Sequence, residues 1–324
     1  NAWNISGANA GTLNATTAFT GIETLNGGTG NDTFTLGAGV TSFNGSINGG
    51  GATVADVLAA TDGTNAWAIS GANAGTLNAT TAFTGIETLN GGTGDDTFTL
   101  GAGVTSFNGS ISGGAATVAD VLAATDGTNS WVVTADKAGT LNATTAFADI
   151  ETLTGGTGTD TISVTRNAAT ITLTDTALTV TGETTLALSG FDAANLTGGA
   201  DANAIDASGF DGAVTVNATA GTDTVTGNGT NTTFVGLNDD STWAINTANA
   251  ATYTSGANQS TLTGVTSLAG GTADDTFTLG AGVASFNGSI SGGGATVADV
   301  LAATDGTNAW NISGANAGTL NATT

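Results

Sequence analysis

Residues 27–35, GGTGNDTFT, are the strongest candidate for chemistry in this chain. Gly27, Gly28 and Gly30 can adopt positive φ and expose main-chain carbonyl oxygens, and Asp32 adds a carboxylate. Phe34 would anchor the following strand in a core. Because calcium prefers oxygen ligands of this kind, the stretch predicts a calcium site with Asp32 as its charged ligand.

The same pattern recurs, so the candidate sites form a series. Complete copies begin at Gly91 and Gly155, and looser copies begin at Gly198 and at Gly270, where Ala273 replaces the third glycine. We expect that the protein requires no cofactor, and calcium is the one metal ion that these turns are predicted to bind. Its predicted ligands are the carboxylates of Asp32, Asp96, Asp160 and Asp275, with the main chain of Gly27, Gly28, Gly30, Gly91, Gly92, Gly94, Gly155, Gly156 and Gly158.

The nonapeptide fits G-G-x-G-x-D-x-U-x, where U is a large apolar residue, and so resembles the calcium-binding repeats-in-toxin (RTX) β-roll. In that family the resemblance implies calcium held between tandem turns. Here each motif stands alone, although a second glycine turn at residues 48–58 could stack near the first, with Asp56 in the role of Asp32. The alternative is that glycine only makes the turn and Asp caps main-chain amides.

Self-similarity organises the whole chain. NAWNISGANAGTLNATTAF at Asn1 recurs in close form at Asn65 and Asn129, so the period is 64 residues. We therefore expect repeats at 1–64 and 65–128, a degenerate repeat with an insert at 129–240, a repeat at 241–307 and the start of another at 308–324. The identity of residues 308–324 with residues 1–17 suggests a window from a longer array.

Short alternating runs such as DTFTL and GAVTV, separated by glycine and asparagine clusters, predict short half-buried strands. With 52 glycines and no proline, this pattern favours an all-β fold, a β-solenoid or parallel β-helix built from 64-residue repeats. A string of small β-sandwich domains is the alternative.

Composition excludes several functions. The net charge of -24, with Lys137 and Arg166 the only basic residues, excludes nucleic-acid binding. The chain lacks cysteine and histidine and has no apolar run long enough to span a membrane. Paired carboxylates occur at Asp95 and Asp96, Asp239 and Asp240, and Asp274 and Asp275, but adjacent strand residues point to opposite faces. We therefore expect no enzymatic activity.

Two further sets of residues allow alternatives. The recurrent tryptophans are either core anchors or a row for stacking against carbohydrate, and Lys137 and Arg166 are expected to offset nearby acidic charge. The tryptophans are Trp3, Trp67, Trp131, Trp243 and Trp310.

The wider segments, FTGIETLNGGTGNDTFTL and SGFDAANLTGGADANAIDASGFDGAVTV, are similar to repeats of giant secreted bacterial surface proteins of the adhesin-like and haemagglutinin-like kind. This resemblance implies an extracellular location on the bacterial surface or in its matrix. It implies a structural or adhesive role as a stalk, fibre or self-assembling filament, with self-association and a cell-surface or glycan ligand as expected partners. A calcium-stabilised surface-layer or RTX-type adhesin segment and a glycan-binding module are the alternatives.

Overall fold

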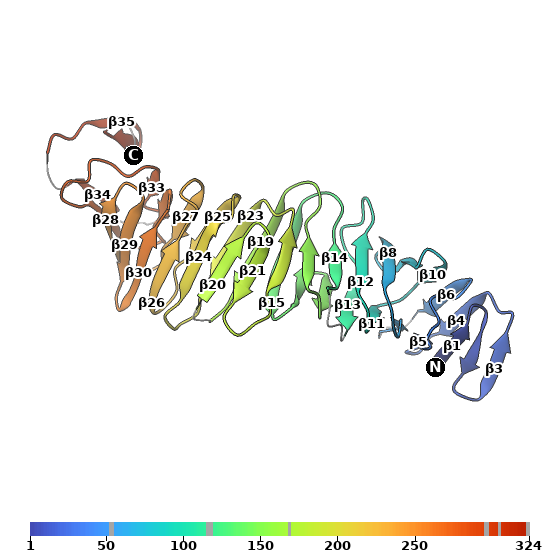
Figure 1. Ribbon diagram of the computed structural model, residues 1–324. Helices are drawn as coiled ribbons and strands as arrows, with labels where there is room; N and C mark the ends of the chain where they lie inside the picture. The colour runs from blue at the N-terminus through green and yellow to red at the C-terminus, as the bar shows by residue number, and fades with distance from the viewer. Residues whose placement is uncertain (52–54, 115–118, 168–169, 295–297, 304–305, 322–324) are drawn as a thin grey trace. The chain divides into compact units, whose positions relative to one another are not determined.

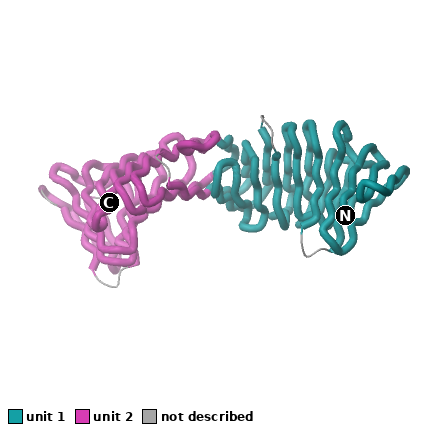
Figure 2. The backbone as a smooth tube through the Cα atoms, turned by 90° about the horizontal axis from the view of Figure 1, so that it is seen from below, with its two compact units in different colours: residues 1–162, 186–191 teal, residues 163–185, 192–324 magenta. Residues whose placement is uncertain are grey.

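The computed structural model describes residues 1–51, 55–114, 119–167, 170–294, 298–303 and 306–321. Every regular element in these ranges is a β-strand, and most strands pair in parallel in a repeated pattern, which confirms the predicted all-β solenoid (Figure 1). The chain forms two compact units: unit 1 is residues 1–162 with 186–191, and unit 2 is residues 163–185 with 192–324 (Figure 2).

Unit 1 contains the strands of the first three sequence repeats. They are β1 (Ala2–Gly7), β2 (Ala10–Leu13), β3 (Thr17–Thr20), β4 (Thr24–Gly28), β5 (Thr33–Leu36), β6 (Ser46–Gly50), β7 (Val57–Ala59), β8 (Asn65–Gly71), β9 (Ala74–Leu77), β10 (Thr81–Thr84), β11 (Thr88–Gly92), β12 (Asp96–Leu100), β13 (Gly109–Gly114), β14 (Val121–Ala123), β15 (Asn129–Ala135), β16 (Ala138–Leu141), β17 (Thr145–Ala148), β18 (Thr152–Thr154) and β22 (Leu186–Ser189). The boundary between the units falls inside β19 (Asp160–Thr165), after Ile162.

Unit 2 contains the degenerate region and the returning repeat. Its strands are β20 (Thr170–Thr174), β21 (Ala177–Val180), β23 (Ala193–Thr197), β24 (Ala204–Gly209), β25 (Ala213–Asn217), β26 (Thr222–Thr226), β27 (Thr232–Val235), β28 (Ser241–Thr247), β29 (Ala250–Ser255), β30 (Asn258–Thr263), β31 (Ser267–Ala269), β32 (Asp275–Leu279), β33 (Ser289–Ser291), β34 (Val300–Ala303), β35 (Trp310–Gly314) and β36 (Ala317–Leu320).

Successive coil strands of unit 1 alternate between two sheets, and within each sheet the coil strands pair in parallel. We call the sheet that holds β5 and β7 the first sheet and the sheet that holds β4 and β6 the second sheet. β5 pairs in parallel with β7, and β4 pairs in parallel with β6. Ser46 follows its partner Thr24 by 22 residues, close to the coil length of about 21 residues that the 64-residue period suggests when divided by three.

Each repeat also contains a three-stranded antiparallel meander that lies within one of the two sheets. In the second repeat β8, β9 and β10 pair antiparallel in sequence, while β8 pairs in parallel with β12 and β10 pairs in parallel with β6. The meander therefore fills three adjacent places between coil strands that are themselves parallel. A coil that includes it is longer, 36 residues from Asn48 to Thr84.

The meanders of successive repeats lie on alternate sheets. Strands β1–β3 belong to the first sheet, β8–β10 to the second and β15–β17 to the first again. The first two repeats each consist of one meander followed by four single strands, and each of these five segments lies on the sheet opposite to the one before it. Because five is odd, the next repeat begins on the other sheet. Two repeats therefore add equal numbers of strands to both sheets, so neither sheet gains more strands than the other.

The core explains the recurrent tryptophans. Trp67 lies in register with Phe98 and stacks on it with ring centroids 5.5 Å apart, while Phe83 meets it edge-on at 6.2 Å. Gly75 makes room for this cluster, because a Cβ there would lie 2.6 Å from Cζ of Phe83. Trp67, Trp131 and Trp243 are buried, so these three are core residues and offer no row for stacking against carbohydrate.

Unit 2 uses shorter coils in the degenerate region. β23 pairs in parallel with β25 and β24 with β26, with a spacing of 20 residues between stacked positions such as Asn203 and Asp223. A meander of β28, β29 and β30 follows, in which Trp243 packs against Tyr253 with ring centroids 4.6 Å apart. The repeat boundaries predicted from the sequence remain a prediction, since the division between the units falls within residues 129–240.

Candidate functional site: the carboxylate ladder

A polar side chain stands at or just before the start of the coil strands, and it is bonded to the coil beside it. In the second sheet the N–H of Asn65 donates to Asp96 Oδ1 at 2.9 Å, and the N–H of Asp96 donates to Asp120 Oδ1 at 2.7 Å. The N–H of Asp120 then donates to Glu151 Oε2 at 2.8 Å. We call this series of stacked side chains the carboxylate ladder.

The first sheet repeats the arrangement one sequence repeat earlier. The N–H of Asp32 donates to Asp56 Oδ1 at 2.7 Å, and the N–H of Asp56 donates to Glu87 Oε2 at 2.9 Å. The predicted stacking of the second glycine turn on the first is therefore present, with Gly28 in register with Gly50. Each carboxylate satisfies an N–H at or just before the start of a strand.

The later coils use the same position. The N–H of Asn129 donates to Asp160 Oδ1 at 3.2 Å, and its side-chain amide donates to the same oxygen at 2.7 Å. In unit 2 the N–H of Asp275 donates to Asp299 Oδ1 at 3.0 Å, and the Ser241 hydroxyl bonds Asp275 Oδ1. The ladder is thus the recurrent polar feature of the described coils.

The four predicted calcium aspartates lie on separate parts of this ladder. Asp32, Asp96, Asp160 and Asp275 are all buried. Because meanders alternate between the sheets, Asp32 lies at the first sheet and Asp96 at the second, so the motif copies are not neighbours. In the described ranges no group of three or more acidic, histidine or cysteine side chains is placed to hold a metal ion. Calcium at these turns stays a prediction.

The glycines of the motif occupy their positions for different structural reasons. A Cβ on Gly91 would collide with Asp96 Oδ2 and would lie 2.6 Å from the carbonyl oxygen of Gly113 in the next coil. Gly92 has φ of 115°, in a region that side chains disfavour. The corresponding first glycines Gly27 and Gly155 are similarly crowded by the neighbouring coil. Gly30 differs, since a Cβ there would meet nothing within 4 Å.

Burial sets the electrostatics of the second-sheet ladder. Desolvation raises the pKa of Asp96 to about 6, against hydrogen bonds from Asn65 that act to lower it. Desolvation likewise raises the pKa of Asp120 to about 6, and the negative charge of Glu151 adds to the shift. In unit 2, burial raises the pKa of Asp223 as well. Asp96 and Asp120 therefore take up protons at a higher pH than an exposed aspartate does.

The two basic residues pair with carboxylates, as expected from their setting. Lys137 Nζ lies 2.8 Å from Glu151 Oε1, and this hydrogen bond raises the pKa of Lys137. Arg166 Nε lies 2.6 Å from Glu183 Oε1. Lys137 occupies the place of Asn73 in the preceding repeat, whose side-chain amide donates 2.9 Å to the carbonyl oxygen of Asn108.

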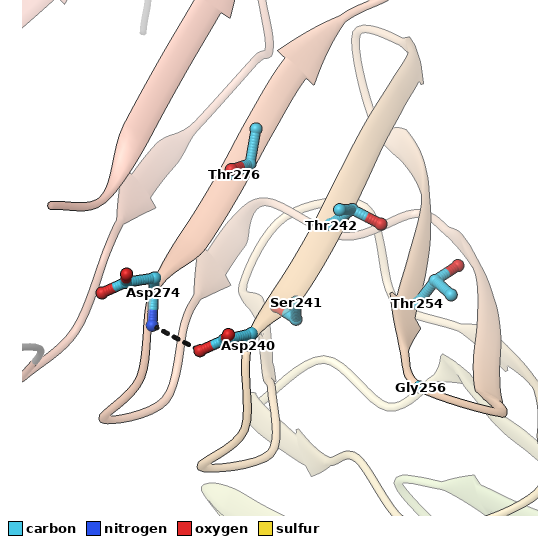
Figure 3. Close-up of a pocket in the computed structure, with 7 residues that line it drawn as sticks. All are labelled: Asp240, Ser241, Thr242, Thr254, Gly256, Asp274 and Thr276. Atoms are coloured by element: carbon cyan, nitrogen blue, oxygen red, sulfur yellow. Dashed lines mark hydrogen bonds between the residues drawn. The ribbon is translucent and has the colours of Figure 1, made fainter.

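A shallow hollow in unit 2 holds two of the paired carboxylates noted in the sequence (Figure 3). It encloses about 300 Å³ beside the start of β28, and the N–H of Asp274 donates to Asp240 Oδ1 at 3.3 Å. Asp275 is buried in the ladder while Asp274 lines the hollow, so the adjacent pair diverges. The remaining lining is hydroxyl-bearing or glycine: Ser241, Thr242, Thr254, Gly256 and Thr276.

Sequence reasoning found part of the ladder. It singled out Asp32, Asp96, Asp160 and Asp275 through their glycines, and Asp56 through the second glycine turn. It missed Glu87, Asp120 and Glu151. The signal was present, because each of these residues directly precedes a short strand, β11, β14 or β18, with a buried leucine at its second position.

Comparison with known proteins adds no relative: no protein-family model matches the chain, and no curated protein matches it. The described residues form no helix of the length and apolar character that crossing a membrane requires. The strand order and pairing place the chain in the structural class of β-solenoid repeat proteins.

Proposed function

We propose that this chain is a non-enzymatic structural segment of a secreted bacterial surface protein, which builds a stalk, fibre or filament by packing against further copies of itself. The observation that carries the proposal is the separation of charge from the sheet faces in unit 1. Every charged residue of residues 1–162 lies in a turn or at the start of a strand, and the outward faces of the strands are neutral.

The second sheet gives the clearest case. A row of outward side chains crosses it with one residue from each strand, and none of them is charged or buried. Register defines the row as Thr24, Ser46, Ala82, Thr76, Ala68, Thr99, Ala123, Thr154 and Ser189. Hydroxyls within it are bonded across coils, as from Ser46 to Thr24 at 3.3 Å.

Two physical arguments connect these faces with self-association. Sheets of parallel strands are covered on both faces in most proteins, whereas the side chains of this row are exposed or half-exposed in the described part of the chain. A chain of net charge -24 repels its own copies, so a neutral face is where two copies can approach most closely. The secreted location is supported by the composition and by the resemblance to giant surface proteins.

A matched pair of lysine variants tests the role of the faces. Ala68 is exposed on the neutral row, and Ala102 is exposed in a turn of the same unit. We expect the wild-type chain to form oligomers or filaments as its concentration rises, Ala102→Lys to behave in the same way, and Ala68→Lys to stay monomeric. Negative-stain microscopy with light scattering measures this. A wild-type chain that stays monomeric, or equal assembly by both variants, would count against the proposal.

A further inference from the structure

Four strands have a neighbour on one side only. In the strand order of the first sheet β3 comes first and β33 last, and in the described ranges β3 pairs with β2 and β33 with β31. In the second sheet β4 pairs with β6 and β34 pairs with β32. A strand with one neighbour presents unpaired main-chain N–H and C=O groups along its other edge, and these groups can bond a further strand.

The interior of the solenoid shows which strand fits the free edges of the first sheet. The sequence TAFT of β3 recurs as TAFT in β10 and as TAFA in β17. These two strands pair on their second side with β6 and β13, which belong to the segments GSINGG and GSISGG. β33 belongs to an identical GSISGG segment, residues 288–293. The free edges of β3 and β33 are therefore complementary.

The second sheet gives a second complementary pair. The sequence TLNGG of β4 recurs in β11, and the shorter TLT forms β18. These strands pair with β7 and β14, which both have the sequence VLA, and β34 is VLAA. Both kinds of pair form together in the interior, where β10 and β11 stack on β6 and β7. The consecutive strands β3 and β4 thus fit the consecutive strands β33 and β34.

Apolar side chains beside these edges are exposed where their interior counterparts are buried. Ile22, which follows β3, is 39% exposed, whereas its counterparts Ile86 and Ile150 are fully buried. Val300 of β34 is 44% exposed, whereas Val121 of β14 is half-buried. Covering such side chains with a further coil removes apolar surface from water, which stabilises the contact.

The hairpin of β35 and β36 stands at a place that belongs to the next meander. Asn321 Nδ2 donates to the carbonyl oxygen of Ala284 at 2.6 Å, and Asn78 of the second meander donates to the carbonyl oxygen of Thr41 in the same way. Asn14 is the counterpart of Asn321 in the identical stretch of the first meander. The first meander of another copy would therefore offer Asn14 to the same oxygen.

Few contacts hold this hairpin. Trp310 is 47% exposed and Ile312 is 72% exposed, whereas Ile5, the counterpart of Ile312, is fully buried. In the described part of the chain β35 pairs with β36 alone, while β1 pairs with both β2 and β5. Because it buries so little apolar surface, the hairpin of β35 and β36 gives up its place more readily than a complete meander does.

We propose that copies of this chain join by strand addition, β3 of one copy to β33 of another and β4 to β34, while the first meander of the incoming copy displaces the hairpin of β35 and β36. The interior register places Ala18 opposite Ser289 and Leu25 opposite Leu301. This inference rests on the proposed assembly of copies and adds a contact separate from the neutral faces. Two pairs of short strands form a small interface, so this contact is transient unless the faces pack as well.

Single cysteines can trap the contact, because the chain has no cysteine of its own. Paired strands lie about 4.8 Å apart, which a disulfide can span. Ala18→Cys mixed with Ser289→Cys and oxidised glutathione should give a mixed disulfide dimer, identified by mass spectrometry. We expect about ten times the yield of Ala102→Cys mixed with Ser289→Cys. Ala18 and Ala102 are both exposed, so a yield no higher than that of this control would overturn the proposal.

Two matched glycine variants test the displacement. Asn14 and Asn321 each accept the N–H at the start of their own hairpin and have φ of 52° and 54°, which glycine also adopts, so both substitutions disturb the hairpins alike. Asn321→Gly, added to the Ser289→Cys copy, should raise the yield about threefold because the hairpin leaves more easily. Asn14→Gly, added to the Ala18→Cys copy, should lower it by a similar factor. Changes in the same direction would contradict the displacement.

The Ala68→Lys variant separates this inference from the proposed packing of the faces. With Ala68→Lys in both partners, the mixed disulfide of Ala18→Cys and Ser289→Cys should still exceed the control, since trapping needs no contact between faces. Its loss would assign the disulfide to the faces and overturn the strand addition. A disulfide that persists while Ala68→Lys and Ala102→Lys assemble equally would support the strand addition and contradict the packing of the faces.

Discussion

The ladder of residues 96–151 and the ladder around Thr232 hold their coils together with different chemistry. The first stacks Asp96, Asp120 and Glu151, and the second stacks Thr232 on Thr266. Both satisfy the first N–H of a strand from the neighbouring coil. The comparison shows that an uncharged side chain can fill this place, so the solenoid needs an acceptor and a close backbone there and does not need a charge.

In both ladders the main chains of neighbouring coils lie close together. Disrupting this close approach should have the largest effect on stability. Gly27→Ala places a methyl group against Asp32 Oδ2 at 2.5 Å and against the carbonyl oxygen of Gly49. We expect a loss of about 3 kcal/mol in the free energy of unfolding, measured by urea denaturation, since neither neighbour can move freely.

Gly30→Ala is the matched control, three residues further along the same motif. A Cβ there meets nothing within 4 Å, so we expect a change within about 0.5 kcal/mol. Equal losses in the two variants would show that the motif needs glycine for its turn and that contact between coils is not the cause.

Charge can also be added to a neutral rung. Asn203→Asp would place a second buried carboxylate beside Asp223, whose pKa burial already raises. We expect a loss of about 1–3 kcal/mol at pH 7 that shrinks below pH 4, because protonation removes the buried charge. Urea denaturation at both pH values measures it. Asn231→Asp, at an exposed turn, serves as the control, and a pH-independent loss at position 203 would sink this account.

The smallest effect concerns the one basic residue beside the ladder. Lys137→Asn restores the residue of the neighbouring repeats and removes the bond to Glu151. The pair is partly exposed, so we expect a change of less than about 1 kcal/mol in the free energy of unfolding at pH 7. A loss well above that value would mean that the positive charge of Lys137 is needed to offset the negative charges of the ladder. The ladder of residues 96–151 would then differ from the Thr232 ladder by requiring a counter-ion as well.

Much of the fold could be read from the sequence because repetition constrains it strongly. The 64-residue period and the alternation in DTFTL predict strands, turns and coils, and the structure has them. The alternation of the meanders could not be read in the same way. Runs such as AGTL have the same pattern in parallel and antiparallel strands, so only the paired structure shows that β8, β9 and β10 reverse within one sheet.

The site was predictable where glycine marked it. Asp32 and Asp96 follow the GGTG turn, but Glu87 and Glu151 follow GI and DI and carry no such mark. The burial of the tryptophans was also open, because an apolar residue at a repeated place can cover a core or bind a ligand. The partner that buries Trp67 is Phe98, 31 residues later, and local periodicity does not report contacts at that distance.

Because a regular repeat has an odd number of segments, the sheet on which the next repeat begins depends on whether the number of preceding repeats is odd or even. Removing one whole repeat from the array would start every later coil on the opposite sheet, so the surfaces that those coils present would be turned over with respect to the coils before them. Removing two would restore the original side. An array of near-identical repeats can thus change its length in small steps, yet keep its outward sides in phase only when it gains or loses repeats in pairs.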